Sequence, residues 1–250
     1  MTAPDRRLAG ADPRITEAGR TGLELSVRPA TMPAMTATID GLAPFHWLNL
    51  PESDGGGPPL GVIFSVAYFR GLDAAEVARR FSHGTDPGTV TDFGGLVERV
   101  RRFVEETAGC HGGGHVGIVE AGEWCVAVEP HGWLAILSDV VAALSRGCEM
   151  LSINRHDHAS VSDFVYAIDG EIVTTFPVGR SCDRHGADPD LLNDLMRELG
   201  MCVDPLEDAE AAAQHAALPQ AFALAARITG VPFAADMLDR PMLVARIADL

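Results

Sequence analysis

The most regular hydrophobic pattern in the chain lies in residues 93–107. Apolar residues there recur at helical spacing and fall on one stripe: Leu96, Val97, Val100, Phe103 and Val104. Charged residues occupy the rest of the segment, which is typical of a helix packed on a protein core. A shorter helix is predicted from Asp73 to about Arg80, because Asp73 is a suitable N-cap and Glu76 completes a capping-box pattern.

Other segments have the composition of β-strands. Residues 60–69 form an apolar run rich in β-branched and aromatic residues, which predicts a buried strand. Shorter strands and a helix are expected further along, separated by glycine-containing turns. The strands are 116–120, 124–129, 133–137 and 148–154, and the helix is 139–145.

Asp169-Gly170 is the strongest hairpin signal, because this pair suits a two-residue turn between strands. The strands are predicted at 162–168 and 171–178. Regular alternation groups Phe164, Tyr166, Val173 and Thr175 on one face, and Val165, Ala167, Ile172 and Thr174 on the other. Because both faces are largely apolar, we expect the hairpin to be covered on both sides.

The last part of the chain has a helical pattern. Beyond Asp188 an apolar stripe over 191–199 is closed by Gly200, and further helices are predicted at 206–216, 219–229 and 234–249. Helices and strands do not alternate as they do in parallel sheets. The sequence therefore predicts an α+β fold: a mostly antiparallel sheet (a β-meander) flanked by helices, with a helical, acidic C-terminal part over 188–250.

Domain organisation follows from the same patterns. Residues 1–40 lack periodicity and are predicted to be a disordered leader. Met32 and Met35 lie near its end, so either could be the natural start. Residues 41–250 are then expected to form a single domain.

Composition excludes several chemistries. All 19 basic residues are arginine. The chain therefore lacks the lysine that a P-loop, a pyridoxal enzyme or a protein kinase requires. The 35 acidic residues give a formal net charge of −16, which argues against a nucleic-acid partner. A solvated acidic surface is the favoured explanation of this charge, and a surface that binds a basic protein is the alternative.

Cysteine usage and hydropathy bear on the compartment. The five cysteines are widely spaced and form no Cys-x-x-Cys, unlike a secreted disulfide framework. The N-terminus lacks the apolar core of a signal peptide, and no apolar run reaches the roughly 20 residues of a membrane span. We therefore expect a cytoplasmic protein with no membrane partner.

The glycine-rich segment 110–117 matches three known functional motifs by sequence pattern alone. As a dinucleotide fingerprint it follows a helix and opens a strand, which is the reverse of the required order. As an esterase oxyanion loop it lacks a Gly-x-Ser-x-Gly elbow elsewhere in the chain. Cys110, His111 and His115 offer metal-type side chains, but a flexible helix-to-strand connector is favoured.

Two further groups are candidate sites. Trp124 and Trp133 bracket a turn with Glu129 and His131, either as aromatic anchors of a hairpin or as a binding edge that exposes Glu129 and His131. The second group could hold zinc, since two histidines alternate on one strand and a cysteine and a histidine follow on a later loop. Its members are His156, His158, Cys182 and His185. Exposed histidines at a strand end are the favoured alternative, so no cofactor is favoured.

Two segments have distinctive sequences: the Trp-Cys-Val-Ala-Val-Glu-Pro-His-Gly-Trp hairpin at 124–133 and the Ala-Phe-Ala-Leu-Ala-Ala-Arg-Ile-Thr-Gly helix at 221–230. Together with the segments 69–77, 142–147, 169–170 and 186–190, they resemble an actinobacterial family of domains of unknown function. The resemblance covers about 43–245 and implies no particular activity. In that family positions 156 and 158 usually hold other residues, which weighs against zinc there.

These observations favour a non-catalytic, immunity-like or regulatory protein that binds a protein partner, basic in charge, through its acidic surface. The sequence contains no complete catalytic signature, which agrees with this interpretation. The alternatives are a metal-assisted hydrolase using His156 and His158 with Cys182 or His185, and a small-molecule-binding domain built around the hairpins.

Overall fold

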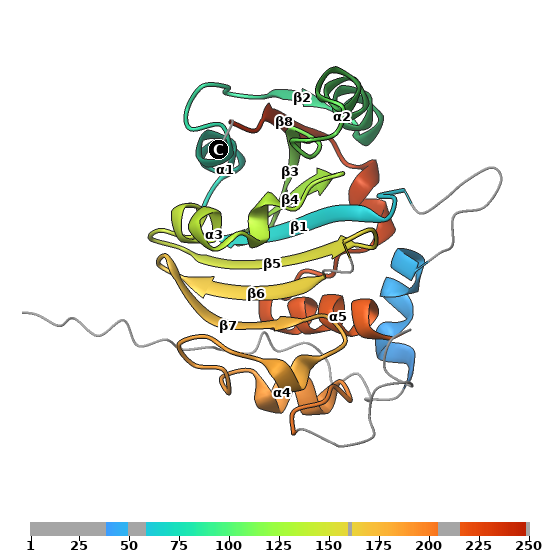
Figure 1. Cartoon of the computed structure of the whole chain (residues 1–250), viewed down its shortest axis with the longest axis vertical. Coiled ribbons are helices and arrows are strands. Elements are labelled where there is room, and N and C mark those ends of the chain that lie inside the picture. The colour runs from blue at the N-terminus through green and yellow to red at the C-terminus, as the bar shows by residue number, and fades with distance from the viewer. Residues whose placement is uncertain (1–38, 50–58, 160–161, 205–215, 249–250) are drawn as a thin grey trace, which may run out of the picture.

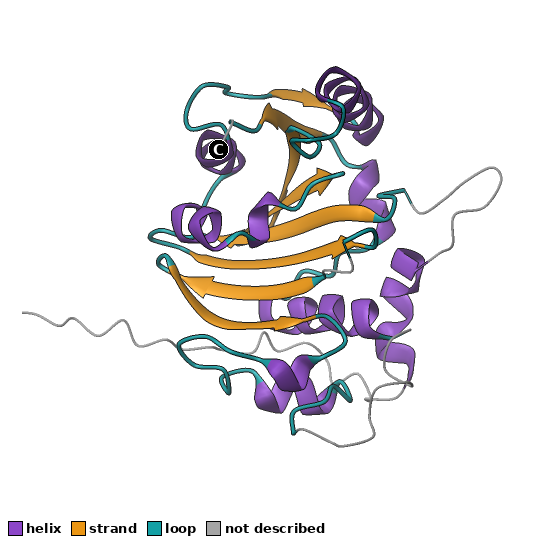
Figure 2. Cartoon of the chain, viewed as in Figure 1, coloured by secondary structure: helices purple, strands orange, loops and turns teal. Residues whose placement is uncertain are grey.

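The computed structural model describes residues 39–49, 59–159, 162–204 and 216–248. They form one antiparallel sheet of eight strands in the order β2-β8-β3-β4-β1-β5-β6-β7 (Figure 1, Figure 2). The strands are β1 (Ile63–Arg70), β2 (Thr89–Thr91), β3 (His115–Ala121), β4 (Trp124–Pro130), β5 (Glu149–His156), β6 (Asp163–Ile168), β7 (Glu171–Pro177) and β8 (Met242–Arg246). The predicted α+β class is confirmed.

Helices cover both faces of this sheet. The α-helices are α1 (Ala74–Phe81), α2 (Phe93–Thr107), α3 (Ser138–Leu144), α4 (Asn193–Glu198) and α5 (Ala217–Thr229), and the 3-10 helices are η1 (Ile39–Asn49), η2 (Leu134–Ile136), η3 (Ser181–Asp183) and η4 (Ala235–Asp239). One face packs against α2, α4, α5, η1 and η4, and α5 also contacts η1 (Figure 1). The other face packs against α1, α3 and η2.

Strand alternation produces two hydrophobic cores. Along β1, Phe64, Val66 and Tyr68 enter the core beneath α5, whereas Ala67 and Phe69 enter the core beneath α1. Successive side chains of a strand point to opposite faces, so a run apolar at nearly every position needs cover on both sides. The unbroken apolar run at 60–69 is therefore explained by burial on both faces.

Local sequence signals set the ends of several helices. Asp73 caps α1 by accepting a hydrogen bond from Glu76 N at 2.7 Å, as the capping pattern predicts. Asp92 caps α2 in the same way by accepting from Gly95 N at 2.7 Å. α2 spans the predicted 93–107, and α5 ends at the left-handed Gly230.

The predicted final helix at 234–249 is wrong. The short η4 is followed by β8, which pairs with β2 and with β3 in the sheet. Pro241 cannot continue a helix, and the apolar run after it fits either secondary structure by periodicity alone. Tertiary contacts decide that this segment is a strand. β8 supplies hydrogen-bond partners to β3, which would otherwise be an open edge of the sheet. The part 188–250 is therefore mixed, not wholly helical.

Two other predictions differ from the structure or lie outside it. Residues 133–137 contain the 3-10 turn η2 in place of a strand, because a buried carboxylate, described below, accepts its first backbone N–H groups. The predicted helix at 206–216 lies almost wholly outside the described residues. The predicted leader and the two candidate start residues, Met32 and Met35, also lie outside them.

The hairpin at Asp169-Gly170 is confirmed, but its predicted faces are partly wrong. A β-bulge between Tyr166 and Ala167 shifts the register, so that Phe164 pairs with Phe176 and Tyr166 with Thr174. A one-residue shift exchanges the two faces of a strand beyond the bulge. The rings of Phe164 and Phe176 stack at 4.7 Å between centroids as a result. Cover on both faces of the hairpin is confirmed.

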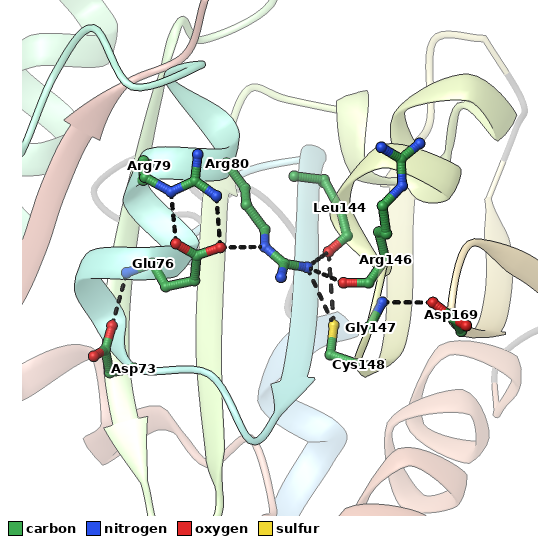
Figure 3. Close-up of polar contacts among 9 residues, drawn as sticks. All are labelled: Asp73, Glu76, Arg79, Arg80, Leu144, Arg146, Gly147, Cys148 and Asp169. Atoms are coloured by element: carbon green, nitrogen blue, oxygen red, sulfur yellow. Dashed lines mark hydrogen bonds and ion pairs between the residues drawn. The ribbon is translucent and has the colours of Figure 1, made fainter. Parts of the chain in front are cut away.

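A polar network joins α1 to the turn between α3 and β5 (Figure 3). The carboxylate of Glu76 accepts from Arg79 Nε at 2.6 Å and from Arg80 Nε at 2.8 Å. The other end of the Arg80 guanidinium donates to Leu144 O at 2.6 Å and to Arg146 O at 2.9 Å. Because Leu144 ends α3, Arg80 satisfies a carbonyl that has no partner within its own helix. The network therefore fastens two helices over the same core.

Candidate functional site

The structure brings together two groups that the sequence kept apart. The turn after β4 carries His131 and Trp133, and the end of β5 carries His156 and His158. The rings of Trp133 and His156 lie 5.2 Å apart between centroids. Burial lowers the pKa of His131, and the charges of His156 and His158 lower it further. We call His131, Trp133, His156 and His158 the histidine cluster.

Backbone contacts hold the cluster in place. His131 adopts a left-handed φ of 55°, and its N–H donates to Ile63 O at 2.8 Å, across the start of β1. On the other side of β1, Asp157 N donates to Val62 O at 3.2 Å, and Ala159 N donates to His156 Nδ1 at 3.1 Å. The end of β4, the start of β1 and the end of β5 therefore lie side by side at one end of the strands. We call this the histidine end of the sheet.

Glu129 is the second-last residue of β4, close to the histidine cluster. The prediction that it is exposed is wrong. The residue is only 1 % exposed because the pleat of β4 turns it toward the face covered by η2. Its two carboxylate oxygens accept from Leu134 N at 3.3 Å and from Ala135 N at 3.2 Å. Burial raises the pKa of Glu129 to about 7, against the smaller opposing effect of these two hydrogen bonds.

A row of buried polar residues continues from Glu129 across the sheet. Ser65 on β1 lies opposite Glu129 on one side and Asn154 on the other. Ser65 Oγ lies 3.4 Å from Ser152 Oγ, and Asn154 Oδ1 accepts from Asp163 N at 2.6 Å. Sequence reasoning missed these residues. The available signal was the alternation of Ser152 and Asn154 with apolar residues in β5.

Trp124 lies away from the histidine cluster. It occupies the other end of β4 and is buried on the opposite face of the sheet. The guanidinium of Arg70 lies 5.9 Å from the centre of its ring, and Arg70 also pairs with Glu123 and Glu149 at 3.3 and 3.2 Å. Trp124 is therefore an anchor of the hairpin in this structure, and Trp133 alone of the two lies at the candidate site.

The four predicted zinc ligands do not converge. His156 and His158 lie near His131, whereas Cys182 lies against Cys202 and His185 pairs with Thr175 beside β7. In the part of the chain that the structure describes, no three His, Cys, Asp or Glu side chains are arranged to hold a metal ion. Zinc binding therefore stays a prediction, and metal analysis of the purified protein would test it.

A pocket of about 660 Å³ opens beside the cluster, between the ends of β5, β6 and β7. Its lining includes Arg155, His156, Asp163 and Arg180. The guanidinium of Arg155 already makes hydrogen bonds within the chain. It donates to both carboxylate oxygens of Asp157 at 2.9 and 2.6 Å and to Leu48 O at 2.8 Å. Small-molecule binding at this pocket also stays a prediction.

The glycine-rich connector before β3 packs tightly beneath the cluster. A Cβ on Gly113 would lie 2.1 Å from Pro130 O, and one on Gly114 would lie 2.4 Å from the ring of Phe103. Gly112 has a φ of +64° and lies under the ring of Trp133. The segment is therefore a close-packed support for the Pro130–Trp133 turn, and the expected flexible connector is corrected.

We expect Gly113→Ala to destabilise the protein, because the new methyl group collides with backbone that cannot swing aside. The free energy of unfolding should fall by about 1–3 kcal/mol, as for other overpacked sites. Gly41→Ala is the matched control, since a Cβ at Gly41 meets nothing within 4 Å. Urea unfolding of both variants measures the difference, and equal effects would contradict the packing argument.

The fold and site define a class: an α+β protein with one antiparallel sheet, helices on both faces, and a histidine cluster beside a buried carboxyl. The model of a family of unknown function, DUF6461, matches residues 43–248, and the chain belongs to that family. No curated protein and no solved structure matched the chain.

Proposed function

We propose that this domain is a non-catalytic binding protein, of a regulatory or immunity-like kind, that holds a basic protein partner on its acidic surface. The observation that carries the proposal is a surplus of exposed carboxylates that make no ion pair among the described residues. They are Asp73, Asp92, Glu106, Glu120, Asp139, Asp169, Glu171, Asp188, Asp204, Asp236 and Asp239.

The arginines do not offset this surplus. Most of the described arginines are already paired with carboxylates of the same chain: Arg70, Arg79, Arg80, Arg101, Arg102, Arg155, Arg180, Arg184, Arg197 and Arg227. Among the described residues, the excess of negative charge is therefore carried largely by carboxylates that face solvent. A field of one sign attracts partners of the other sign and speeds their encounter.

The surroundings of Glu129 support a role other than catalysis. Its pKa of about 7 would suit a general acid or base. However, η2 donates backbone hydrogen bonds to both of its oxygens, and a Cβ on Gly132 would lie 2.6 Å from Glu129 Cβ. A catalytic carboxyl must reach a substrate atom within hydrogen-bond distance, whereas this one is covered by its own chain.

Affinity capture from native cells, with the full chain as bait, tests the proposal. We expect a basic protein to be retained at about 0.01 M salt, where the Debye length is about 30 Å, and released near 1 M, where it is about 3 Å. Retention of no protein at low salt, or of an acidic one that salt does not release, would contradict the proposal.

Charge variants would locate the binding face. One variant neutralises Asp236 and Asp239, which line a hollow of about 560 Å³ together with Asp92, and another neutralises Asp139 and Glu171. At least one should weaken capture. Asp194→Asn is the matched control, because this exposed carboxylate is already paired with Arg197 at 3.1 Å and should be dispensable.

The source and compartment are part of the proposal. We propose an actinobacterial, cytoplasmic protein, because a chain without lysine suits a genome rich in G and C, and the five cysteines are free thiols. No helix among the described residues is long and apolar enough to cross a membrane.

A further inference from the structure

Two partly exposed cysteines lie on neighbouring segments beside β7. Cys182 lies in η3 and Cys202 in the segment after α4, and the nearby Cys202 thiol is one of the groups that raise the pKa of the Cys182 thiol. Hydrogen bonds on either side hold these segments together. Ser181 Oγ donates to Cys202 O at 2.7 Å, and the guanidinium of Arg184 donates to Val203 O. The backbone therefore brings the two thiols together without any bond between them.

We propose that Cys182 and Cys202 are a reversible disulfide site, which forms when the protein meets a small disulfide oxidant. One thiolate attacks a sulfur of the oxidant and releases one small thiol, and the second cysteine displaces the other from the mixed disulfide. The two cysteines lose two electrons and two protons in total, and the oxidant leaves as two thiols. This inference is independent of the proposed basic partner.

The surroundings set which oxidant should react. Burial, the neighbouring Cys202 and the carboxylate of Asp183 all raise the pKa of the Cys182 thiol. The thiolate is the attacking form, so the reaction should speed up as pH rises above neutrality. The same negative charge repels anionic disulfides such as oxidised glutathione, and we therefore expect an uncharged disulfide to react faster.

The other three cysteines are poor competitors. Cys125 and Cys148 are buried, whereas Cys182 and Cys202 are partly exposed. Burial is the distinguishing feature, because the Cys202 thiol also donates to a carbonyl, that of Asp204, at 3.0 Å. Cys110 is exposed, but it lies beyond the end of α2 and its thiol contacts only Ala108 O. Only Cys182 and Cys202 therefore combine solvent access with a neighbouring thiol among the described residues.

A disulfide here would close a loop of about 20 residues around α4 and restrict the unfolded chain. A loop of that size typically stabilises enough to raise the melting temperature of a domain this large by about 5–10 °C. The bond would also fasten residues 201–204 to η3, which lies beside β7.

The experiment treats the full chain with 2-hydroxyethyl disulfide, blocks free thiols in acid denaturant, and maps the tryptic peptides. With no lysine present, trypsin cuts only after arginine, so Cys182 falls in residues 181–184 and Cys202 in residues 198–227. We expect these two peptides joined, with a mass two hydrogen atoms below their sum. Dithiothreitol should separate them, and the rise in melting temperature should disappear with the bond.

Variants distinguish this site from general oxidation. Cys182→Ser and Cys202→Ser should each abolish both the joined peptide and the temperature shift, whereas Cys110→Ser should preserve both. The joined peptide should form independently of protein concentration. The proposal is overturned if the two peptides stay separate while Cys110 is modified, if Cys182 joins a different cysteine, or if the bond forms only between chains.

Discussion

Arg80→Ala should lower the free energy of unfolding by about 2–4 kcal/mol, because one guanidinium bridges two helices and a turn. Its side chain is only 16 % exposed, and it donates to the carboxylate of Glu76 and to the carbonyls of Leu144 and Arg146 (Figure 3). Removing it leaves those two carbonyls without this partner and leaves a gap where the aliphatic stem packed. Equilibrium urea unfolding measures the loss.

The neighbouring Arg79 is a matched control for this prediction. Arg79 also pairs with Glu76, but its side chain is 61 % exposed and it reaches no second element. Exposed pairs of this kind contribute about 0–1 kcal/mol, so Arg79→Ala should be nearly neutral. Arg80→Lys should be intermediate, because an ammonium group cannot match the fork of a guanidinium. Equal losses in Arg79→Ala and Arg80→Ala would refute the bridging role.

The second large effect is a pH dependence carried by Glu129. Its pKa rises from an ordinary 4.5 to about 7 on folding, chiefly because burial disfavours the charged form. The folded state therefore holds a proton that the unfolded state has lost between these pH values. Stability is complete below about pH 4.5 and falls as the pH rises toward 7. At about 1.4 kcal/mol per pKa unit, the loss above pH 7 is about 3–4 kcal/mol.

Glu129→Gln isolates this contribution, since the amide is neutral at every pH and similar in shape. We expect the stability of the variant relative to the unsubstituted protein to rise by about 3–4 kcal/mol from pH 4.5 to pH 8. A constant loss is expected at every pH, because the amide nitrogen cannot accept the hydrogen bond from Leu134 N or Ala135 N. The measured quantity is the difference in unfolding free energy across pH, because other groups titrate as well. Glu120→Gln, at an exposed carboxylate on β3, serves as the control. A difference that does not change with pH would contradict the assignment.

The sequence identified much of the secondary structure because those signals are local. The capping of α1 by Asp73, the extent of α2 and the turn at Asp169-Gly170 depend on residues within a few positions of each other. β8 could not be found this way, since its partners β2 and β3 lie more than a hundred residues away in the chain. The bulge after Tyr166 was equally hidden, because register depends on what each face packs against.

The candidate site shows the same division. Sequence patterns singled out Glu129, His131 and Trp133 on one segment and His156 on another, but they suggested an exposed carboxylate and a zinc set with Cys182 and His185. The structure buries Glu129 beneath η2 and places Cys182 in the segment that is hydrogen-bonded to Cys202, away from His156. Both outcomes depend on contacts between segments that composition and periodicity cannot specify.

By itself, the sequence determined the α+β class, the helix caps, the hairpin turn, the acidic surplus and the exclusion of lysine-dependent chemistry. These properties follow from residue type and from spacing within single elements. Only the tertiary structure decided which strand pairs with β3 and which face of the sheet Glu129 occupies. It also decided that His131 and His156 lie close together at the ends of neighbouring strands. Burial and strand pairing join residues far apart in the chain, and the energy of such contacts exists only once the whole sheet has formed.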